Sequence, residues 1–112
     1  MSTMNLLLAQ CAPQYEALDS AAATPWLAEV PSWAAVDEGR AIERRFEFDN
    51  FYQTMAFVNA LAEIAHAQDH HPALSVAYDS CTVLFSTHSA KGLTLNDFIC
   101  AAQVSALPEA HP

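Results

Sequence analysis

Two pairs of segments in this chain alternate apolar and polar residues, and this alternation constrains the fold more than any other feature of the sequence. The first pair, residues 32–36 and 41–48, flanks Asp37-Glu38-Gly39-Arg40, where Gly39 can adopt the positive φ of a tight turn. The second pair, residues 74–78 and 81–87, meets at a short polar break. Alternation with a period of two is typical of half-buried strands, so each pair is predicted to form an antiparallel hairpin.

A segment with helical spacing follows each hairpin. Residues 51–66 begin after Asn50, which stands in capping-box spacing to Gln53, and residues 94–106 begin at Thr94. The predicted buried stripes are Phe51, Met55, Val58, Leu61, Ala62 and Ala65 in the first of these helices, and Leu95, Phe98, Ile99, Ala102 and Ala106 in the second.

A shorter helix is predicted ahead of the first hairpin, with Thr24 as N-cap, Pro25 as its first residue and Pro31 as its stop. The element order is therefore α-β-β-α-β-β-α. Two joined hairpins with helices packed on one face make a four-stranded antiparallel sheet of the α+β class. The 112 residues suit a single domain. We expect this domain to span residues 25–107, after a loosely held N-terminal arm (1–24) and before a short tail (108–112).

One charged side chain interrupts the apolar side of a predicted strand. In the segment 41–48, Ile42, Phe46 and Phe48 share a face with Arg44. A guanidinium on that face is expected near a sheet edge or at a mouth open to solvent.

The charge balance argues against two classes of partner. The chain has 4 basic and 13 acidic side chains and a net charge of -9, whereas nucleic-acid binding depends on Lys and Arg that neutralise phosphates. Direct binding to nucleic acid or to an anionic membrane is therefore not expected. No apolar run approaches the ~20 residues of a membrane span. The three cysteines lack CxxC spacing, which indicates reduced thiols and a cytoplasmic location.

Histidines are concentrated in one part of the chain. His66, His70, His71 and His88 fall within a stretch of 23 positions. His70 and His71 adjoin Pro72, where the long helix must end, and His88 follows the last strand. Functional sites are often built at such element ends, and imidazole titrates close to neutral pH. These residues are therefore candidates for acid–base chemistry.

The segment His66-Ala67-Gln68-Asp69-His70-His71-Pro72, followed by Tyr78, His88 and Asp97, resembles the signature of the pterin-4a-carbinolamine dehydratase family. The family pattern is a polar residue, three spacers, His-His-Pro, an aromatic residue, a further His, and an Asp in the following helix. The similarity extends over about residues 30–106.

The resemblance implies dehydration of a 4a-hydroxytetrahydropterin, the 4a-carbinolamine, to the quinonoid dihydropterin in tetrahydrobiopterin recycling. This reaction delivers a proton to the 4a-hydroxyl and removes one from N5, with no metal and no other cofactor. By the same resemblance His70 and His88 carry the acid–base work, and His71 joins the catalytic set chiefly by binding and orienting the pterin. The other substrate-binding residues that the resemblance implies are Asp69, Pro72, Tyr78 and Asp97.

The resemblance also bears on partners. The family is oligomeric, so a homodimer or homotetramer is expected, and a four-stranded sheet has edges that need cover. Functional coupling to an aromatic amino acid hydroxylase is left open. Some family members act as dimerisation partners of transcription factors, so a non-catalytic protein-binding module of the coactivator type is the alternative function.

Four of the candidate positions have a second interpretation. Asp69 can be a helix-end residue that tunes His70. Asp97 has N3 spacing to Thr94 and can simply cap the last helix, and Tyr78 can belong to the core. His66 can lie on a solvated helix face.

His66 and His70 also have the spacing of a helical metal site that His88 or Asp69 would complete, but Ala67 stands where a metallohydrolase carries its Glu.

Overall fold

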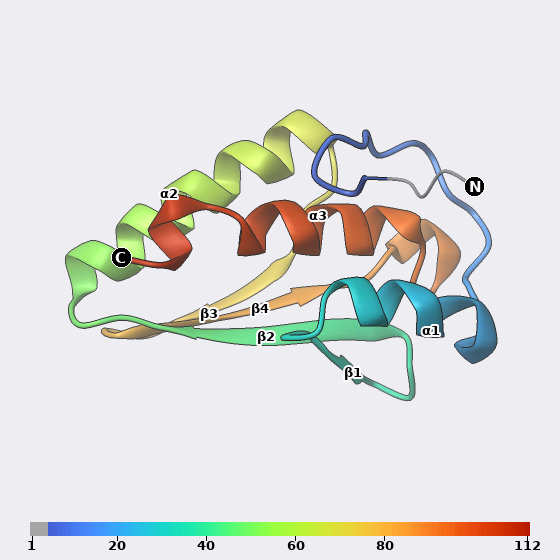
Figure 1. The fold of residues 1–112 in the computed structure, drawn as a ribbon, viewed down its shortest axis with the longest axis horizontal. Coiled ribbons are helices and arrows are strands. Elements are labelled where there is room, and N and C mark those ends of the chain that lie inside the picture. The colour runs from blue at the N-terminus through green and yellow to red at the C-terminus, as the bar shows by residue number, and fades with distance from the viewer. Residues whose placement is uncertain (1–4) are drawn as a thin grey trace.

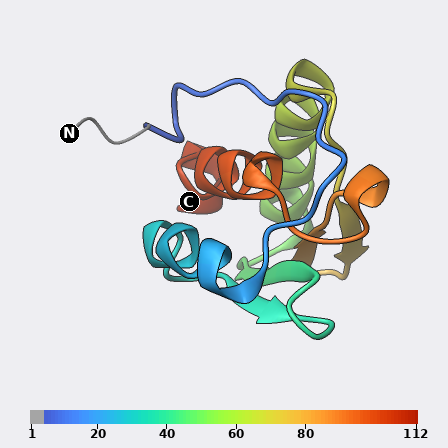
Figure 2. The same cartoon turned by 90° about the vertical axis from the view of Figure 1, so that its right-hand side faces the viewer.

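The alternating segments form four strands, and the segments with helical spacing form helices on one side of them. This computed structural model describes residues 5–112. Figure 1 shows the three helices above a single sheet, and Figure 2 shows the same layers end-on. The elements are α1 (Ser20–Glu29), β1 (Ala34–Val36), β2 (Ala41–Glu47), α2 (Phe51–Gln68), β3 (Ala73–Val76), β4 (Ser80–Phe85) and α3 (Leu95–Ser105), with 3-10 turns at His88–Ala90 and Pro108–Ala110. The predicted α+β class and element order are confirmed.

The sheet is antiparallel throughout, with strand order β1-β2-β4-β3. The two hairpins join through β2 and β4, where Ile42 pairs with Phe85 and Phe46 with Cys81. All four of these side chains are buried. Because paired residues point to the same face, β2 and β4 present an apolar surface to the helices, interrupted only where Arg44 pairs with Val83.

Helix α2 begins where predicted, but its buried stripe coincides only in part with the predicted one. The Asn50 side chain accepts a hydrogen bond from the Gln53 N–H at 2.9 Å. The buried positions of α2 are Thr54, Phe57, Leu61 and Ala65, whereas Phe51 is 49% exposed. The prediction is right at Leu61 and Ala65, but it missed Thr54 because Thr54 counted as polar. Its hydroxyl lies 3.0 Å from the Tyr78 carbonyl oxygen and can therefore be buried without an unsatisfied group.

Helix α3 begins after Thr94 as predicted and is buried on more than one side. Phe98 and Ile99 lie in the core as expected, but Ala106 is exposed. Cys100, Ala101 and Val104 are buried instead. The extra cover comes from α1 and from the N-terminal segment, which Figure 2 shows in blue running over α3 toward the end of α2.

The predicted start of the first helix at Thr24 is wrong. Helix α1 begins at Ser20, and the Asp19 carboxylate accepts a hydrogen bond from the Ala22 N–H at 2.8 Å. Asp is a strong N-cap residue, and this cap sets the start five residues earlier. Pro25 therefore lies inside α1, where its missing N–H costs one backbone hydrogen bond.

The described part of the predicted arm makes specific contacts with the domain. Asn96 on α3 bonds both backbone groups of Ala12, donating to its carbonyl at 2.7 Å and accepting from its N–H at 3.1 Å. Leu18 donates to the Leu93 carbonyl at 2.8 Å, and the neighbouring Gly92 has no room for a side chain, because an added Cβ would lie 2.9 Å from the Ala17 Cβ. Residues 1–4 of the arm lie outside the described residues. The division into arm, domain and tail stays a prediction.

The chain end packs back on the helices. Leu107 and Ala110 lie against the hydrophobic core, and the His111 ring nitrogen Nε2 is 2.7 Å from the Ser105 carbonyl oxygen. Across residues 5–112, no helix combines the length and the apolar character that crossing a membrane requires.

Candidate active site

The antiparallel β3–β4 pair brings the predicted histidines to one end of the sheet. Ala73, at the start of β3, pairs with Leu84, near the end of β4. Continuing this register past the strands sets position 70 opposite position 87. The loop before β3 and the loop after β4 therefore lie side by side, although they are far apart in the sequence.

A left-handed residue ends α2 and turns the chain into this site. Asp69 is the C-cap, with φ 50° and ψ 44°, and its N–H bonds back to the last turn of the helix. The His70 N–H donates to the Ala65 carbonyl at 3.1 Å. Pro72 cannot continue a helix, so the chain enters β3 directly. This sharp corner directs the His70 side chain inward, while His71 remains exposed.

The His70 side chain ends on a buried carboxylate. Its Nε2 lies 2.6 Å from Oδ1 of Asp97, which is fully buried on α3. The other carboxylate oxygen, Oδ2, accepts hydrogen bonds from the Thr87 hydroxyl at 2.8 Å and from the Thr94 N–H at 2.9 Å. Asp97 thus acts as a hydrogen-bond acceptor, which leaves the donor role in the contact with His70 to the imidazole. Nε2 of His70 therefore carries a proton toward Asp97, and Nδ1 is the nitrogen left for chemistry.

Packing and charge both act on the His70 imidazole. The ring stacks on Phe85, with centroids 6.0 Å apart and planes 9° apart, which restricts its orientation. Burial alone lowers the pKa of His70, but the hydrogen bond and the charge of Asp97, with smaller contributions from Cys11 and Asp69, outweigh it. The net result is a pKa above the ordinary value, so the structure favours the imidazolium form of His70.

Asp97 caps a helix and contacts a histidine, while the substrate contact that the resemblance implies for it stays a prediction. It completes a capping box with Thr94 at the start of α3, and it also contacts His70 directly. One carboxylate with two oxygens can do both because each oxygen serves a different partner. Capping holds Asp97 in position, and the fixed carboxylate in turn orients the imidazole.

His88 lies next to this network on a closed loop. Thr87, which bonds Asp97, directly precedes His88, and it forms an isolated β-bridge with Gly92. The Thr87 N–H donates to the Gly92 carbonyl at 2.9 Å, which closes the loop on itself. His88 opens the 3-10 turn in this loop, and its side chain is exposed. It is therefore free to meet a ligand at the surface.

Tyr78 is the predicted site residue that this chain does not bring to the histidines. It lies in the turn between β3 and β4, at the opposite end of the hairpin from His70. At about 3.3 Å per residue, β3 alone separates the two ends by roughly 10 Å. Tyr78 is 64% exposed and stacks on Phe51, so it does not belong to the core either.

Asp69 and Pro72 remain at the histidine corner. Asp69 is exposed and lines a hollow of about 140 Å³ with Cys11, Gln68 and Asn96. Pro72 is half-buried between His71 and β3.

The helical geometry that suggested a metal site is not formed. His66 is exposed on the last turn of α2, but the helix ends at Gln68 and the chain reverses at Asp69. His70 therefore leaves the helical face and bonds Asp97 instead. Residues 5–112 contain no cluster of three or more His, Cys, Asp or Glu side chains arranged to hold a metal ion.

Three contributors to the site were not assigned from the sequence. Phe85 ends β4, and the buried alternation Cys81, Val83, Phe85 continues beyond the strand to Thr87. The alternating pattern of the sequence therefore indicated that both side chains point inward. Cys11 carried none. Its sulfur lies 3.7 Å from that of Cys100, and both are free thiols. Only the folding of the N-terminal segment over α3 brings Cys11 close enough to act on His70.

Comparison with known proteins identifies a family. Residues 16–107 match the family model described as pterin 4 alpha carbinolamine dehydratase. A protein of Stenotrophomonas maltophilia, provisionally named pterin-4-alpha-carbinolamine dehydratase, is 51% identical over 110 residues, covering 96% of this chain and 95% of its own. A protein of Chromobacterium violaceum with the same provisional name is 49% identical over 106 residues, covering 93% and 96%.

Two solved structures resemble the fold. A transcriptional coactivator/pterin dehydratase from Brucella melitensis matches with a TM-score of 0.77 and 32% identity, over 81% of this chain and 97% of its own. A pterin dehydratase-like protein described as a RuBisCO assembly factor in the alpha-carboxysome matches with a TM-score of 0.60 and 25% identity, over 67% and 87%.

Proposed function

This chain belongs to the pterin-4-alpha-carbinolamine dehydratase family, and on that premise we propose that it dehydrates a 4a-hydroxytetrahydropterin with His70 and His88 as its proton-transfer groups. The observation that carries this proposal is the 2.6 Å contact between His70 Nε2 and the buried Asp97 carboxylate. A histidine oriented in this way has a defined tautomer and one free ring nitrogen, as an acid–base catalyst requires.

The proposed reaction eliminates water across the C4a–N5 bond without a change in oxidation state. The C4a–O bond breaks, and the hydroxyl leaves as water after it receives a proton. The N5–H proton is removed, and its electron pair forms the C4a=N5 double bond of the quinonoid dihydropterin. A positioned acid or base contributes typically ~10²–10⁴-fold to each proton transfer.

His70 fits the role of the acid. Its net pKa is raised because the attraction of Asp97 outweighs the effect of burial. The imidazolium therefore persists to higher pH than for an ordinary histidine, and its Nδ1–H can protonate the departing hydroxyl. After the transfer, the Asp97 carboxylate still accepts the Nε2–H bond, so the ring keeps its orientation.

His88 and His71 complete the proposed set. His88 is exposed on the loop beside Thr87 and serves as the base that takes the N5 proton. His71 is exposed at the corner next to His70 and binds the pterin, together with Asp69 and Pro72. The product is a quinonoid dihydropterin, so the same proposal gives the protein a role in tetrahydrobiopterin recycling. Coupling to a pterin-dependent aromatic amino acid hydroxylase would supply the substrate.

Steady-state kinetics on single variants test this assignment. His70→Ala and His88→Ala should mainly lower kcat, by ~10²–10³-fold, because acid–base groups act on the transition state. His71→Ala should mainly raise KM, because an orienting residue binds ground and transition states alike. The His70/His88 double variant should lose less than the product of the single losses, since both act on one coupled event.

His66→Ala is the matched control, because it removes an exposed imidazole one turn before His70 and should leave kcat and KM unchanged. Uncatalysed dehydration in buffer is subtracted at every pH. A full kcat in His88→Ala, or wild-type turnover in the double variant, would show that the active site lies elsewhere.

A protein-binding module is the second candidate function. It is favoured by a group of exposed apolar side chains, namely Phe51, Tyr52, Leu74, Val76 and Tyr78. One of the two similar structures is described as a transcriptional coactivator/pterin dehydratase and the other as a RuBisCO assembly factor. Both descriptions fit the class of protein-binding modules. Turnover of a 4a-carbinolamine no faster than in buffer, by folded protein, would favour this function over the enzyme.

A further inference from the structure

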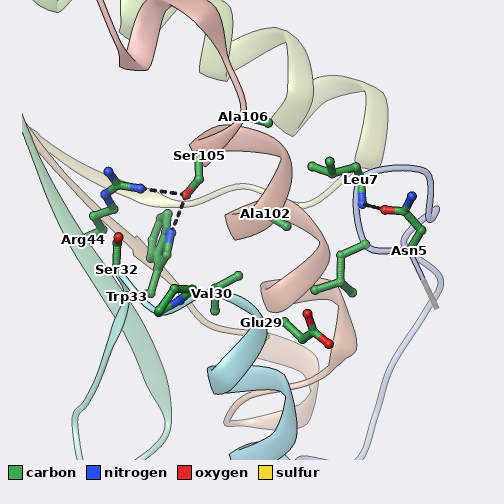
Figure 3. A pocket seen from close by; sticks show the side chains of 12 residues that line it. Asn5, Leu7, Glu29, Val30, Ser32, Trp33, Arg44, Ala102, Ser105 and Ala106 are labelled. Carbon is green, nitrogen blue, oxygen red and sulfur yellow. Dashed lines mark hydrogen bonds between the residues drawn. The ribbon is translucent and has the colours of Figure 1, made fainter. Parts of the chain in front are cut away.

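A cavity of about 580 Å³ opens between α1, α3 and residues 5–7, apart from the histidine site. Figure 3 shows the side chains around it, which come from β2, α3, the loop between α1 and β1, and the N-terminal segment. None of the proposed catalytic or pterin-binding residues lines this cavity. Its volume lies within the usual range for small-molecule sites, roughly 300–1,000 Å³.

One side chain in the cavity wall, Arg44, is positively charged and has no acidic partner among residues 5–112. Arg44 lines it and is half-buried, with its guanidinium carbon 4.3 Å from the centre of the Phe46 ring. Within residues 5–112, no carboxylate oxygen lies within 4.0 Å of a guanidinium nitrogen of Arg44. The sequence Met-Ser-Thr-Met at positions 1–4 has no carboxylate side chain to offer. A partly buried charge is costly unless it is paired, so this arginine has capacity for an anion.

The polar groups around Arg44 that remain available to a ligand are hydrogen-bond donors. Ser105 Oγ accepts a bond from Arg44 Nη1 at 3.0 Å and another from Trp33 Nε1 at 2.8 Å (Figure 3). A hydroxyl that accepts two bonds has used both lone pairs and has only its proton left to donate. The remaining guanidinium N–H groups are donors as well. An incoming ligand group at this point must therefore be an acceptor.

The rest of the lining limits the class of ligand. Val30, Leu7 and Ala102 add apolar surface beside the donors. Glu29 lines the same cavity, and the whole chain has a net charge of -9, so a second negative charge on the ligand would be repelled. A planar carboxylate matches the guanidinium fork, and one apolar body fills the remaining volume.

We propose that this cavity binds a small organic monocarboxylate, whose carboxylate pairs with Arg44 and the Ser105 hydroxyl while its apolar body lies against Val30 and Ala102. The site is separate from the histidine corner and does not depend on the dehydratase proposal. Ser105 is the residue that makes it possible, because an acidic side chain at this position would neutralise Arg44 from within the chain.

Ligand titrations test the proposal with probes of matched shape. Trp33 reports on the cavity through its fluorescence in a Trp26→Phe background, which removes the other tryptophan. Benzoate and phenylacetate should bind saturably. Benzamide has the shape of benzoate without its charge, and inorganic phosphate has charge without an apolar body, so each should bind at least ~10-fold more weakly, a loss of about 1.4 kcal/mol.

Two variants and one control assign the binding to Arg44. Arg44→Gln should weaken benzoate binding at least ~10-fold. Ser105→Asp should abolish it by supplying a carboxylate from α3, and should not lower the melting temperature, which guards against a folding artefact. Arg45→Gln makes the same charge change on the opposite face of β2, beside Glu47, and should bind benzoate as the parent does. Equal affinity for benzoate and benzamide, unchanged binding in Arg44→Gln or Ser105→Asp, or no saturable binding of either carboxylate up to about 10 mM would overturn the proposal.

Discussion

At the scale of single residues, the proposed roles of His70 and His71 follow from what each side chain contacts. His70 has a buried carboxylate on one ring nitrogen and an aromatic ring against its face. His71, the next residue, is exposed. Two adjacent residues of the same type thus have different environments because the left-handed Asp69 turns the chain between helix and strand. This difference is the structural basis for assigning them different roles.

Asp97→Asn should move the basic limb of the pH–rate profile to lower pH. The proposed acid must be protonated, so activity falls as pH rises through the pKa of His70. Asp97 raises that pKa, and its loss leaves burial, which lowers it. The measurement is kcat/KM against pH for both proteins, with the His70 ring signals followed by NMR. Thr87→Ser keeps the hydroxyl donor to Asp97 and should retain the parent profile. An unchanged basic limb in Asp97→Asn would contradict the role given to this pair.

The same substitution should change how stability depends on pH. A histidine whose folded pKa is raised adds stability that is fully present below its unfolded pKa of about 6.5 and is lost as pH rises through the folded value. We therefore expect the parent protein to lose this increment across that window, above pH ~6.5, and Asp97→Asn to lose less of it. Urea unfolding at a series of pH values measures the difference. Parallel stability curves for the two proteins would contradict this expectation.

Turnover should survive exhaustive dialysis against EDTA. The proposed steps are proton transfers by imidazole groups, and the Asp97 carboxylate holds His70 in position. The assay is turnover before and after dialysis, with the metal content of each sample measured. A loss of turnover that added zinc restores would bring back the metal-site interpretation of the histidines.

At the scale of elements, local signals set where a helix begins, but packing sets which face is buried. Asn50 and Thr94 start α2 and α3 where their capping patterns predict. The buried face of α2 is nevertheless rotated from the predicted stripe, because Thr54 satisfies its hydroxyl against the turn after β3. A period of 3.6 residues identifies a helix, but a mostly apolar helix offers more than one candidate stripe.

Two phenylalanines on α2 test which stripe is buried. Phe57 is fully buried, with its ring centroid 4.5 Å from that of Phe46 and 5.3 Å from that of Phe48. Phe57→Ala should cost roughly 3–5 kcal/mol of unfolding free energy. Phe51→Ala, on the exposed side, should cost less than about 1 kcal/mol. Urea unfolding monitored by circular dichroism compares them, and equal losses would contradict the observed orientation of α2.

At the scale of the whole molecule, the helices cover one face of the sheet and leave the edge strand β3 open. Leu74 and Val76 point to the same side as the buried Val83 and Cys81 of β4, yet they are 38% and 44% exposed. An edge strand with unpaired backbone groups and exposed apolar side chains is a surface for another chain.

A homodimer or homotetramer is therefore expected in solution. Light scattering on the eluate of a sizing column should give a multiple of the chain mass at micromolar concentration. Leu74→Lys/Val76→Lys should reduce that mass if β3 contributes to the contact. Ala34→Lys introduces a charge on β1, at the opposite edge of the sheet, and is the matched control. A monomer mass for the parent chain would contradict the expectation.

The sequence by itself determined the element types and the family. Alternation identified the two hairpins, helical spacing and caps identified α2 and α3, and His-His-Pro marked the corner that begins the candidate site. These features are readable because each depends on residues only a few positions apart. Local patterns can still mislead where two of them compete. Thr24-Pro25 predicted one helix start, but α1 begins after the earlier cap, Asp19.

Only the tertiary structure decided which distant groups meet. The contact between His70 and Asp97 spans 27 positions, and that between Cys11 and Cys100 spans 89. Nothing near either residue specifies its partner, because such contacts depend on helix rotation, strand register and the path of the N-terminal segment. The same holds for Arg44. The sequence predicted a charged residue at a mouth or an edge, but the packing of α1 and α3 around it made the cavity and left its charge without an acidic partner.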